Sequence, residues 1–427
     1  MVHAIVGACW GDEGKGKITD MFAEQSDIVV RYQGGANAGH TIINDKGRVV
    51  LHLIPSGACY THTVNVIGNG VALDIGRLLA ELDQLHSAGV NPRLMISDRA
   101  QVVMPWHLLF DGCEEARLAG RSFGSTKSGI APFYSDKYAK TGITVGELYY
   151  PDRLREKIDA ALAVKNLILE QLYHRPPLNG EEIFAQFTAQ AEQIRPYVAD
   201  TFSFLSDAVR AGKNILLEGQ LGSLKDPDLG IYPMTTSSHT LAGFGSVGAG
   251  GIPPYAITRV TAVVKAYSSA VGAGPFVSEI FGDEADRMRE HGGDRGEYGA
   301  TTGRPRRMGW FDTVAARYGC RAQGATEAVL TVVDALGYLD EIRVCVGYEV
   351  DGKVLTDFPI NPVLERAKPV LRTFPGWKCD IRGIRSYREL PAACRDYIAF
   401  IEEEIGVPVK MVTNGPRRED VLYKPQE

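Results

Sequence analysis

Short runs of apolar and β-branched residues recur along the chain, and between them apolar positions fall at helical spacing. Each run is long enough for one buried strand, and we expect strands at residues 4–6, 28–32, 49–54, 64–67, 215–217, 260–264, 328–333 and 342–346. A set of leucines at helical spacing predicts a helix over 74–86, and residues 152–210 are helical in pattern with a break at 175–177. Strands that alternate with helices indicate an α/β fold with a large, mostly parallel central sheet flanked by helices.

The chain has 427 residues, and no Ser-, Pro- or Gly-rich linker divides it. We therefore expect one domain over residues 1–427, with a helical insertion at about 150–212 and small β insertions. The net charge of -6 argues against a nucleic-acid partner, because nucleic-acid-binding surfaces are basic. The first expected strand follows Met1 almost directly, no apolar run reaches membrane length, and the seven cysteines form no C-x-x-C pair. These features predict a cytoplasmic protein with reduced thiols and no membrane partner.

A glycine-rich segment, residues 7–17, follows the first expected strand and reads GACWGDEGKGK. Its glycines let backbone N–H groups turn toward an anion, and the helix that we expect from Ile18 adds positive potential. The spacing matches the phosphate-loop pattern G-x-x-x-x-G-K, but Ile18 stands where a Ser or Thr hydroxyl would bind magnesium. Asp12, inside the loop, is the candidate to replace that oxygen or to transfer a proton. A solvated glycine-rich turn is the alternative.

A second loop with candidate chemistry spans residues 33–41 and holds Asn37 and His40 among three glycines. It follows the second expected strand. Because parallel strands carry their ligand-binding loops at one edge of the sheet, we expect His40 to lie near Asp12. There His40 could act as a general acid or stabilise charge on a phosphate leaving group. A surface histidine without a chemical role is the alternative.

A third segment, residues 299–307, contains three arginines among Gly, Pro and Thr. This composition is typical of a loop that binds a carboxylate or a phosphate through bidentate arginine contacts. A solvated basic turn is the alternative.

Taken together, these segments resemble the adenylosuccinate synthetases. The matching motifs run over essentially the whole chain and lie at residues 11–17, 31–35, 37–41, 51–57, 232–233, 236–238, 265–267, 271–275, 300–307, 376–377 and 415–416. The resemblance implies GTP-dependent ligation of L-aspartate to IMP, which gives adenylosuccinate, GDP and phosphate through a 6-phosphoryl-IMP intermediate. This reaction would be the first committed step from IMP to AMP in purine nucleotide biosynthesis.

The resemblance also implies catalytic roles. Asp12 would remove the N1 proton of IMP, and His40 would stabilise charge at the β–γ bridge of GTP. Lys15, together with Lys17, would offset the charge on the phosphoryl oxygens. One Mg2+ ion per subunit would be held by Asp12 and the carbonyl of Gly39, with GTP as co-substrate.

The remaining contacts that the resemblance implies fall into three groups. GTP would bind at Gly11, Glu13, Gly14, Lys15, Gly16, Lys17, Gly39, His40, Thr41, Arg306, Asp334, Thr413 and Gly415. IMP would bind at Asp12, Glu13, Lys15, Asn37, Ala38, Gly39, His40, Thr126, Lys140, Gln220, Leu221, Thr236 and Arg304. L-Aspartate would bind at Val271, Ala300, Thr301, Thr302, Arg304 and Arg306. Lys140 would reach the IMP phosphate of the partner subunit, so the expected assembly is a homodimer with a shared active site.

Several positions depart from the usual family pattern. Residues 218–222 read EGQLG in place of EGAQG, so the IMP-binding glutamine is displaced by one residue. Lys140 replaces an arginine, and Val332 replaces a lysine that packs on the guanine ring. We still expect GTP to be preferred over ATP, because Asp334 would hydrogen-bond the guanine edge. Residues 127–128 and 413–414 also differ from the family pattern.

Two other functions are compatible with parts of the sequence. A phage-type synthetase ligates aspartate to a guanine nucleotide, but that branch lacks the aspartate of the first loop, which this chain keeps as Asp12. A nucleotide-binding regulatory or scaffold protein would not need Asp12, His40 and the arginine loop together. The sequence therefore favours the IMP ligase.

Overall fold

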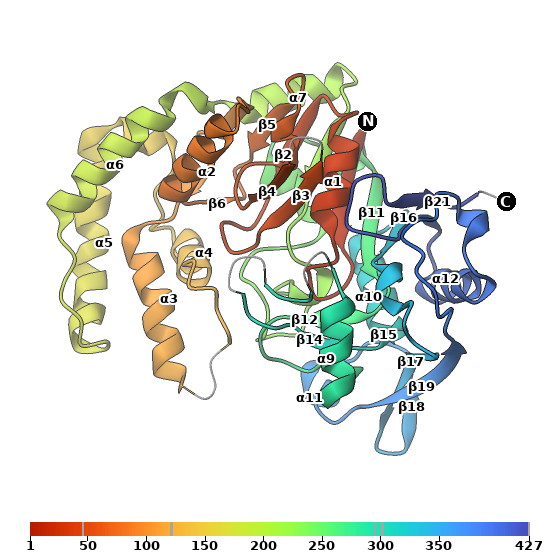
Figure 1. The fold of residues 1–427 in the computed structure, drawn as a ribbon. Helices are drawn as coiled ribbons and strands as arrows, with labels where there is room; N and C mark the ends of the chain where they lie inside the picture. The colour runs from red at the N-terminus through yellow and green to blue at the C-terminus, as the bar shows by residue number, and fades with distance from the viewer. Residues whose placement is uncertain (45–46, 120–122, 294–295, 300–302, 426–427) are drawn as a thin grey trace.

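The structure is a computed structural model, and it describes residues 1–44, 47–119, 123–293, 296–299 and 303–425. Its centre is a ten-stranded sheet in the order β21-β20-β16-β11-β1-β10-β2-β5-β7-β9 (Figure 1). The strands are β1 (Val2–Gly7), β2 (Ile28–Arg31), β5 (Val64–Ile67), β7 (Arg93–Ser97), β9 (Val198–Ala199), β10 (Ile215–Glu218), β11 (Ile257–Lys265), β16 (Glu327–Thr331), β20 (Val409–Thr413) and β21 (Val421–Tyr423). Neighbouring strands are parallel except for β20 and β21, so the predicted mostly parallel α/β sheet is confirmed.

The central strands are buried over their whole length, which explains why they are continuous apolar runs in the sequence. β1 lies between β10 and β11, and β10 lies beside β2. In the parallel register Glu218, the last residue of β10, pairs with Arg31, the last residue of β2. The loops that follow β1, β2 and β10 therefore leave the sheet at the same edge.

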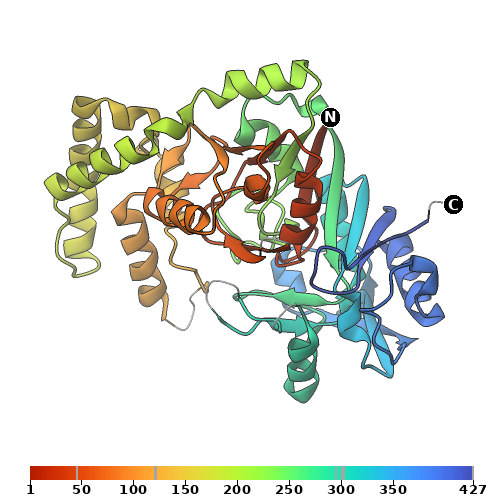
Figure 2. The same ribbon diagram turned by 45° about the horizontal axis from the view of Figure 1, so that its top comes forward.

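Helices cover both faces of this sheet (Figure 1). The helices of the described residues are α1 (Lys15–Ala23), α2 (Ile75–Ser87), α3 (Pro105–Leu118), α4 (Ile130–Tyr138), α5 (Pro151–Gln171), α6 (Gly180–Ile194), α7 (Thr201–Arg210), α8 (Gly245–Ala249), α9 (Gly282–His291), α10 (Thr313–Gln323), α11 (Asn361–Leu364) and α12 (Ala392–Ile405). In two views α3, α5 and α6 lie at the end of the molecule opposite α12 and the C-terminus (Figures 1 and 2). The segment predicted to be helical forms α5, α6 and α7, and the predicted break lies between α5 and α6.

Small sheets carry the remaining strands. β3 (His40–Asn44) pairs with β4 (Gly47–Leu51), and β6 (Ala72–Leu73) pairs with β8 (Gln101–Val102). A three-stranded sheet holds β12 (Ser268–Ala270), β14 (Arg307–Gly309) and β13 (Glu279–Ile280). The last group holds β15 (Phe311–Asp312), β17 (Glu341–Val350), β18 (Lys353–Leu355) and β19 (Lys368–Pro375). The run predicted at 342–346 is thus a strand of this peripheral group.

Three predicted boundaries are wrong for identifiable reasons. The strand expected to reach residue 54 ends at Leu51, because the Glu81 carboxylate accepts hydrogen bonds from the backbone of His52 (2.7 Å) and Ile54 (3.1 Å). The helix expected from Ile18 begins at Lys15, directly after the left-handed Gly14. The strand expected over 328–333 ends at residue 331, because the next residue has a left-handed φ of 59° and starts a 3-10 turn. No helix among the described residues is long and apolar enough to cross a membrane.

Candidate active site

The loop after β1 is organised from inside by the Glu13 carboxylate. It accepts hydrogen bonds from the backbone N–H groups of Gly11 (2.8 Å) and Cys9 (3.1 Å), and it pairs with Lys15 Nζ at 2.6 Å. Both partners of this ion pair are buried. Glu13 therefore supports the loop and holds the Lys15 ammonium, whereas we had expected its contacts to be with nucleotides.

Left-handed backbone brings Asp12 to the surface of the same loop. Gly11 has φ 96° and Gly14 has φ 91°, values that favour glycine, and Asp12 between them has φ 60°. A non-glycine residue in this region is strained, and such strain is concentrated at functional sites. Gly16 lies at the start of α1, where an added Cβ would meet the Thr41 carbonyl oxygen at 2.9 Å. The phosphate loop and the loop that carries His40 are thus in direct contact.

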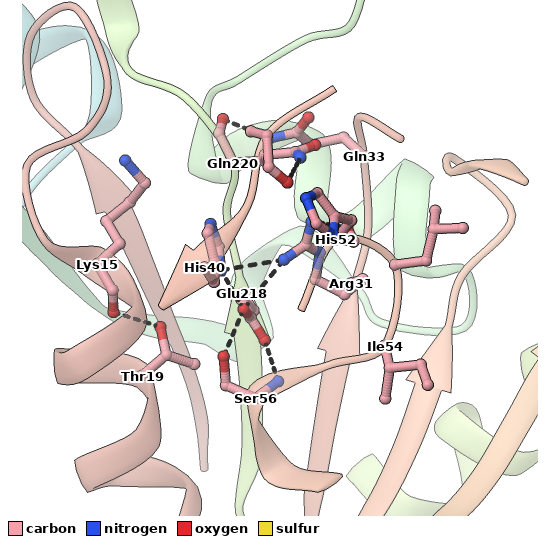
Figure 3. A network of polar contacts seen from close by, with 12 residues as sticks. Lys15, Thr19, Arg31, Gln33, His40, His52, Ile54, Ser56, Glu218 and Gln220 are labelled. Carbon is pink, nitrogen blue, oxygen red and sulfur yellow. Dashed lines mark hydrogen bonds and ion pairs between the residues drawn. The ribbon is translucent and has the colours of Figure 1, made fainter. Parts of the chain in front are cut away.

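His40 is held by a buried polar network centred on Glu218 (Figure 3). The Glu218 carboxylate contacts His40 Nδ1 and accepts hydrogen bonds from Arg31 Nη1 (3.1 Å), Ser56 N (2.8 Å) and Ser56 Oγ (2.7 Å). Arg31 and the attached hydrogen bonds hold the pKa of Glu218 at about 2, so the carboxylate is charged. An anionic Glu218 favours the proton on Nδ1, which leaves Nε2 as the other functional atom of the ring.

The pKa of the His40 imidazole is lowered, because burial and the neighbouring Arg31 outweigh the attraction of Glu218. A neutral ring fixed in this tautomer can accept a proton at Nε2 once negative charge approaches. The two glycine-rich loops lie close together, as predicted. Sequence reasoning did not identify Glu218 as the partner of His40.

The Gln220 side chain holds the loop that carries His40 through hydrogen bonds to the loop's backbone. Its Nε2 donates to the carbonyls of Gly35 (2.9 Å) and Ala38 (3.0 Å), and its Oε1 accepts from the Gly35 N–H at 3.1 Å. The side chain is fully buried. The hydrogen-bonding atoms of the Gln220 amide thus hold the loop, and binding of IMP by Gln220 stays a prediction. Leu221, the other half of that expectation, lines the cavities described next.

Two adjoining cavities share Asp12, Ala38, Gly39, Leu221 and Gly299 in their walls. The first is also lined by residues expected to contact IMP and aspartate, namely Asn37, Thr126, Thr236, Val271 and Arg304. The second is also lined by residues expected to contact GTP, namely Gly14, Lys15, Gly16, His40, Thr41 and Arg306. The two groups of residues thus lie in separate cavities that meet at Asp12.

A family model described as adenylosuccinate synthetase matches residues 4–422. The adenylosuccinate synthetase of Dehalococcoides mccartyi (strain CBDB1) is 43% identical over 99% of this chain and 100% of its own length. The adenylosuccinate synthetase of Synechococcus sp. (strain JA-2-3B'a(2-13)) is 45% identical over 98% of this chain and 93% of its own length. The structure of fully ligated adenylosuccinate synthetase from Plasmodium falciparum superposes with a TM-score of 0.91 at 34% identity, covering 99% of both chains. This chain belongs to the adenylosuccinate synthetase family.

As a family member, the chain is a ligase that joins L-aspartate to IMP at the expense of GTP in purine nucleotide biosynthesis. A second solved structure, a cyanophage S-2L succinoaminodeoxyadenylate synthetase bound to dGMP and dATP, matches at 19% identity with a TM-score of 0.64. At that identity the match establishes a shared fold only.

The arginine loop of this synthetase reaches the first glycine-rich loop. Arg306 Nε lies 3.0 Å from Asp12 Oδ2, as an ion pair without the alignment of a hydrogen bond, and Arg306 Nη1 pairs with Glu297. Glu297 also accepts from Lys265 Nζ at 2.8 Å and from the Tyr267 hydroxyl. Sequence reasoning placed Arg306 in the GTP and L-aspartate sites but did not identify its ion pair with Asp12. Ala300, Thr301 and Thr302 lie outside the described residues.

The expected guanine contacts lie beside the second cavity. Asp334 follows β16 in a 3-10 turn, where one carboxylate oxygen pairs with Arg382 Nε at 2.9 Å and the other is buried without a partner among the described residues. Val332 lines the cavity and donates its N–H to Thr413 Oγ1 at 3.0 Å. Lys17 donates to the carbonyls of Gly415 and Asp420, both at 2.9 Å, so its ammonium positions the C-terminal loop, and its contact with phosphate stays a prediction.

Several polar residues of this site were missed by sequence reasoning. Arg31 and Glu218 each end an apolar strand run, and a charged residue in that position was an available signal. Lys225 lines the first cavity from a 3-10 turn and carried no motif. Lys140 has a left-handed φ of 67°, follows α4 and is exposed, and it is absent from the described walls of both cavities.

Proposed function

We propose that Asp12 and His40 perform the ligation at the junction of the two cavities, with IMP in the first and GTP in the second. The observation that supports this most is that Asp12, Ala38 and Gly39 line both cavities. Two nucleotides bound there would meet head to head at the Asp12 carboxylate. Asn37, whose Oδ1 is buried without a partner among the described residues, would bind IMP in the first cavity.

The proposed reaction has two steps. Asp12 accepts the N1 proton of IMP, and the electron pair released increases the nucleophilicity of O6. O6 then attacks the γ-phosphorus of GTP, the bond from phosphorus to the β–γ bridging oxygen breaks, and GDP leaves. The amine of L-aspartate attacks C6 of 6-phosphoryl-IMP, phosphate leaves with the C6–O bond, and the amine loses a proton.

His40 and Lys15 are proposed to stabilise the charge that moves in the first step. GTP phosphates in the second cavity would raise the pKa of His40, and Nε2 could then donate to the bridging oxygen as it becomes negative. Lys15 would exchange part of its contact with Glu13 for the phosphoryl oxygens. The first turn of α1 adds backbone N–H groups and the positive end of the helix dipole.

Magnesium fits this arrangement. The Asp12 carboxylate and the Gly39 carbonyl supply hard oxygen ligands at the cavity junction, which is the donor type that Mg2+ requires. When bound, the ion would neutralise phosphate charge. It would also compete with Arg306 for Asp12.

L-Aspartate would bind where Val271 and Arg304 line the first cavity. Arg304 Nη1 donates to the Gly124 carbonyl at 3.3 Å, which joins this loop to the opposite wall. Arg307 donates to the carbonyls of Gly272 (3.3 Å) and Gly274 (2.8 Å) and pairs with Glu279, so it would position the loop at 271–275. We further propose a homodimer in which Lys140 binds the IMP phosphate in the partner's site, because it is exposed and absent from the described walls of its own cavity.

A substrate-omission assay tests the proposed function. Phosphate release and adenylosuccinate formation are measured with IMP, GTP, Mg2+ and L-aspartate, and each component is omitted in turn. We expect full dependence on all four. Replacement of IMP by GMP or dGMP serves as the matched control. Product from a guanine nucleotide and none from IMP would contradict the proposal, and so would binding of GTP without any turnover.

A further inference from the structure

Lys225 places an unneutralised cation in the wall of the first cavity. It ends the 3-10 turn Ser223–Lys225, seven residues after β10, and its side chain is half-buried. Its Nζ donates to the Met234 carbonyl at 3.1 Å. Across the described ranges, no carboxylate lies within ion-pair distance of this ammonium, which retains two further N–H groups.

A partly buried ammonium without an anionic partner is unfavourable, so its presence in a cavity wall indicates an anionic ligand. Burial and Arg307 lower the pKa of Lys225 to about 8, and Asp12 acts in the opposite direction. Lys225 and Asp12 both line the first cavity, without an ion pair between them among the described residues.

The backbone of the same turn fixes where Lys225 lies relative to the nucleotide. Its carbonyl accepts the N–H of Thr236 at 2.9 Å, and Thr236 lines the same cavity. The other donors of this segment are not available, because the Gln220 amide holds the loop and Leu221 has no polar side chain. Lys225 is therefore the side-chain donor that this segment can offer near Asp12.

We propose that Lys225 donates a hydrogen bond to the 6-oxygen of the purine nucleotide and stabilises the negative charge that forms there when Asp12 removes the N1 proton. This inference rests on the proposed function, because it takes Asp12 as the base. It adds a substrate-contacting lysine to the phosphorylation step. It also makes that step depend on a group that titrates in the mildly alkaline range.

Two other anions reach this cavity in the proposed reaction, the IMP phosphate and the carboxylates of aspartate. The position of Lys225 favours the 6-oxygen, because Lys225 lines the same cavity as Asp12, the proposed base at the reacting edge of the purine. The alternatives make different predictions. A lysine that binds aspartate would change the KM for aspartate and leave the phosphorylation of IMP untouched.

The test is positional isotope exchange in GTP labelled with oxygen-18 at the nonbridging β-oxygens, with IMP and Mg2+ and no aspartate. Exchange reports reversible transfer of the γ-phosphoryl group to IMP. We expect the wild type to exchange and Lys225→Met to exchange about 100-fold more slowly, the size typical of losing one donor to a developing oxyanion. Lys225→Arg should recover part of the rate, and Lys353→Met, on the exposed strand β18, should match the wild type.

A pH profile separates this role from a structural one. For the wild type, kcat/KM for IMP should fall as the pH rises through about 8, because the protonated ammonium is the active form. This alkaline limb should be absent in Lys225→Met and displaced upward in Lys225→Arg, while the thermal midpoint and the Kd for GTP stay close to the wild type. If the wild type exchanges and Lys225→Met exchanges at the same rate, the proposed role of Lys225 is overturned and the proposed function is not affected. No exchange in the wild type would overturn the proposed intermediate and this inference with it.

Discussion

The Glu218 carboxylate contacts His40 Nδ1 although the two residues are 178 positions apart in the chain. The same carboxylate accepts hydrogen bonds from Arg31 and from the backbone N–H and the hydroxyl of Ser56 (Figure 3). Glu218 is completely buried. One acid at the end of β10 therefore fixes the tautomer of the proposed catalytic histidine and neutralises a buried arginine.

Glu218→Gln should lower the free energy of unfolding by about 3–5 kcal/mol, because the change leaves the buried Arg31 without its counter-ion. It should also lower kcat, because the preferred tautomer of His40 is lost. Urea titration and steady-state rates measure the two effects. The control is Glu192→Gln, which removes the exposed ion-pair partner of Arg195. It should change neither the free energy of unfolding nor kcat. Equal stability of Glu218→Gln and the wild type would contradict this account of the network.

The central fold was predictable from the sequence, because strands buried on both faces are continuous apolar runs. β1, β5 and β10 were predicted within two residues of their ends. β7, β9, β20 and β21 were not predicted. β9 and β21 are strands of two and three residues at the sheet edges, which leave no apolar run. The end of β4 depends on Glu81, which lies thirty residues further along the chain.

The candidate site was predictable where function requires glycine or a charge inside a loop, as at Asp12 and His40. The roles of supporting side chains were not, because they depend on contacts between distant segments. Gln220 holds the loop beneath His40, and Lys17 holds the loop at Gly415, although local sequence directs both toward a nucleotide. Lys225 has no local signal at all.

Stability should decrease as the pH falls below neutrality, in part through His3. Burial and Arg259 lower the pKa of His3 to about 3 in the folded protein, whereas an unfolded histidine titrates near 6.5. Between these values the unfolded chain binds a proton that the folded protein does not. The free energy of unfolding therefore falls with decreasing pH, by up to about 1.4 kcal/mol per pH unit from this residue.

Urea titrations of the wild type and His3→Gln at pH 7, 6 and 5 measure this contribution. The decrease between pH 6 and pH 5 should be smaller in the variant by about the value for one proton. Identical slopes for the two proteins would show that His3 is not the group responsible.

GTP should be preferred over ATP even though Val332 offers no cation to pack on the base. One buried oxygen of Asp334 has no partner in the described parts of the chain and is available for the guanine N1–H and amino group. Asp334→Asn should reduce the ratio of kcat/KM for GTP to that for ATP by about 10- to 100-fold, the cost of a charged hydrogen bond. Val332→Ala, which alters packing only, should change the ratio much less. Equal kcat/KM for the two triphosphates in the wild type would refute the assignment.

Lys140 should act in the partner subunit's site. Asp12→Asn and Lys140→Leu are each expected to be inactive, and mixed dimers would carry one intact site. Random exchange of subunits should then restore about a quarter of wild-type activity, because half the dimers are mixed and each has one working site of two. No recovery, with exchange verified by differently tagged chains, would place Lys140 in its own subunit's site or in none.

Asp12 is the residue on which the proposed mechanism depends, and it pairs with Arg306 Nε at 3.0 Å. Asp12→Asn removes the base but keeps the size of the side chain, so nucleotide binding should change little. Turnover should fall by at least about 100-fold, the low end for loss of a general base. Kd values for GTP and IMP, measured by calorimetry, establish that the variant still binds both.

The most direct measurement is positional isotope exchange in labelled GTP with IMP and Mg2+, without aspartate, on the wild type and Asp12→Asn. We expect exchange in the wild type, because the γ-phosphoryl group moves reversibly to the 6-oxygen once Asp12 has taken the N1 proton. Asp12→Asn, with both nucleotides bound, should show almost none. Exchange at the wild-type rate in Asp12→Asn would contradict the central claim that this carboxylate is the base.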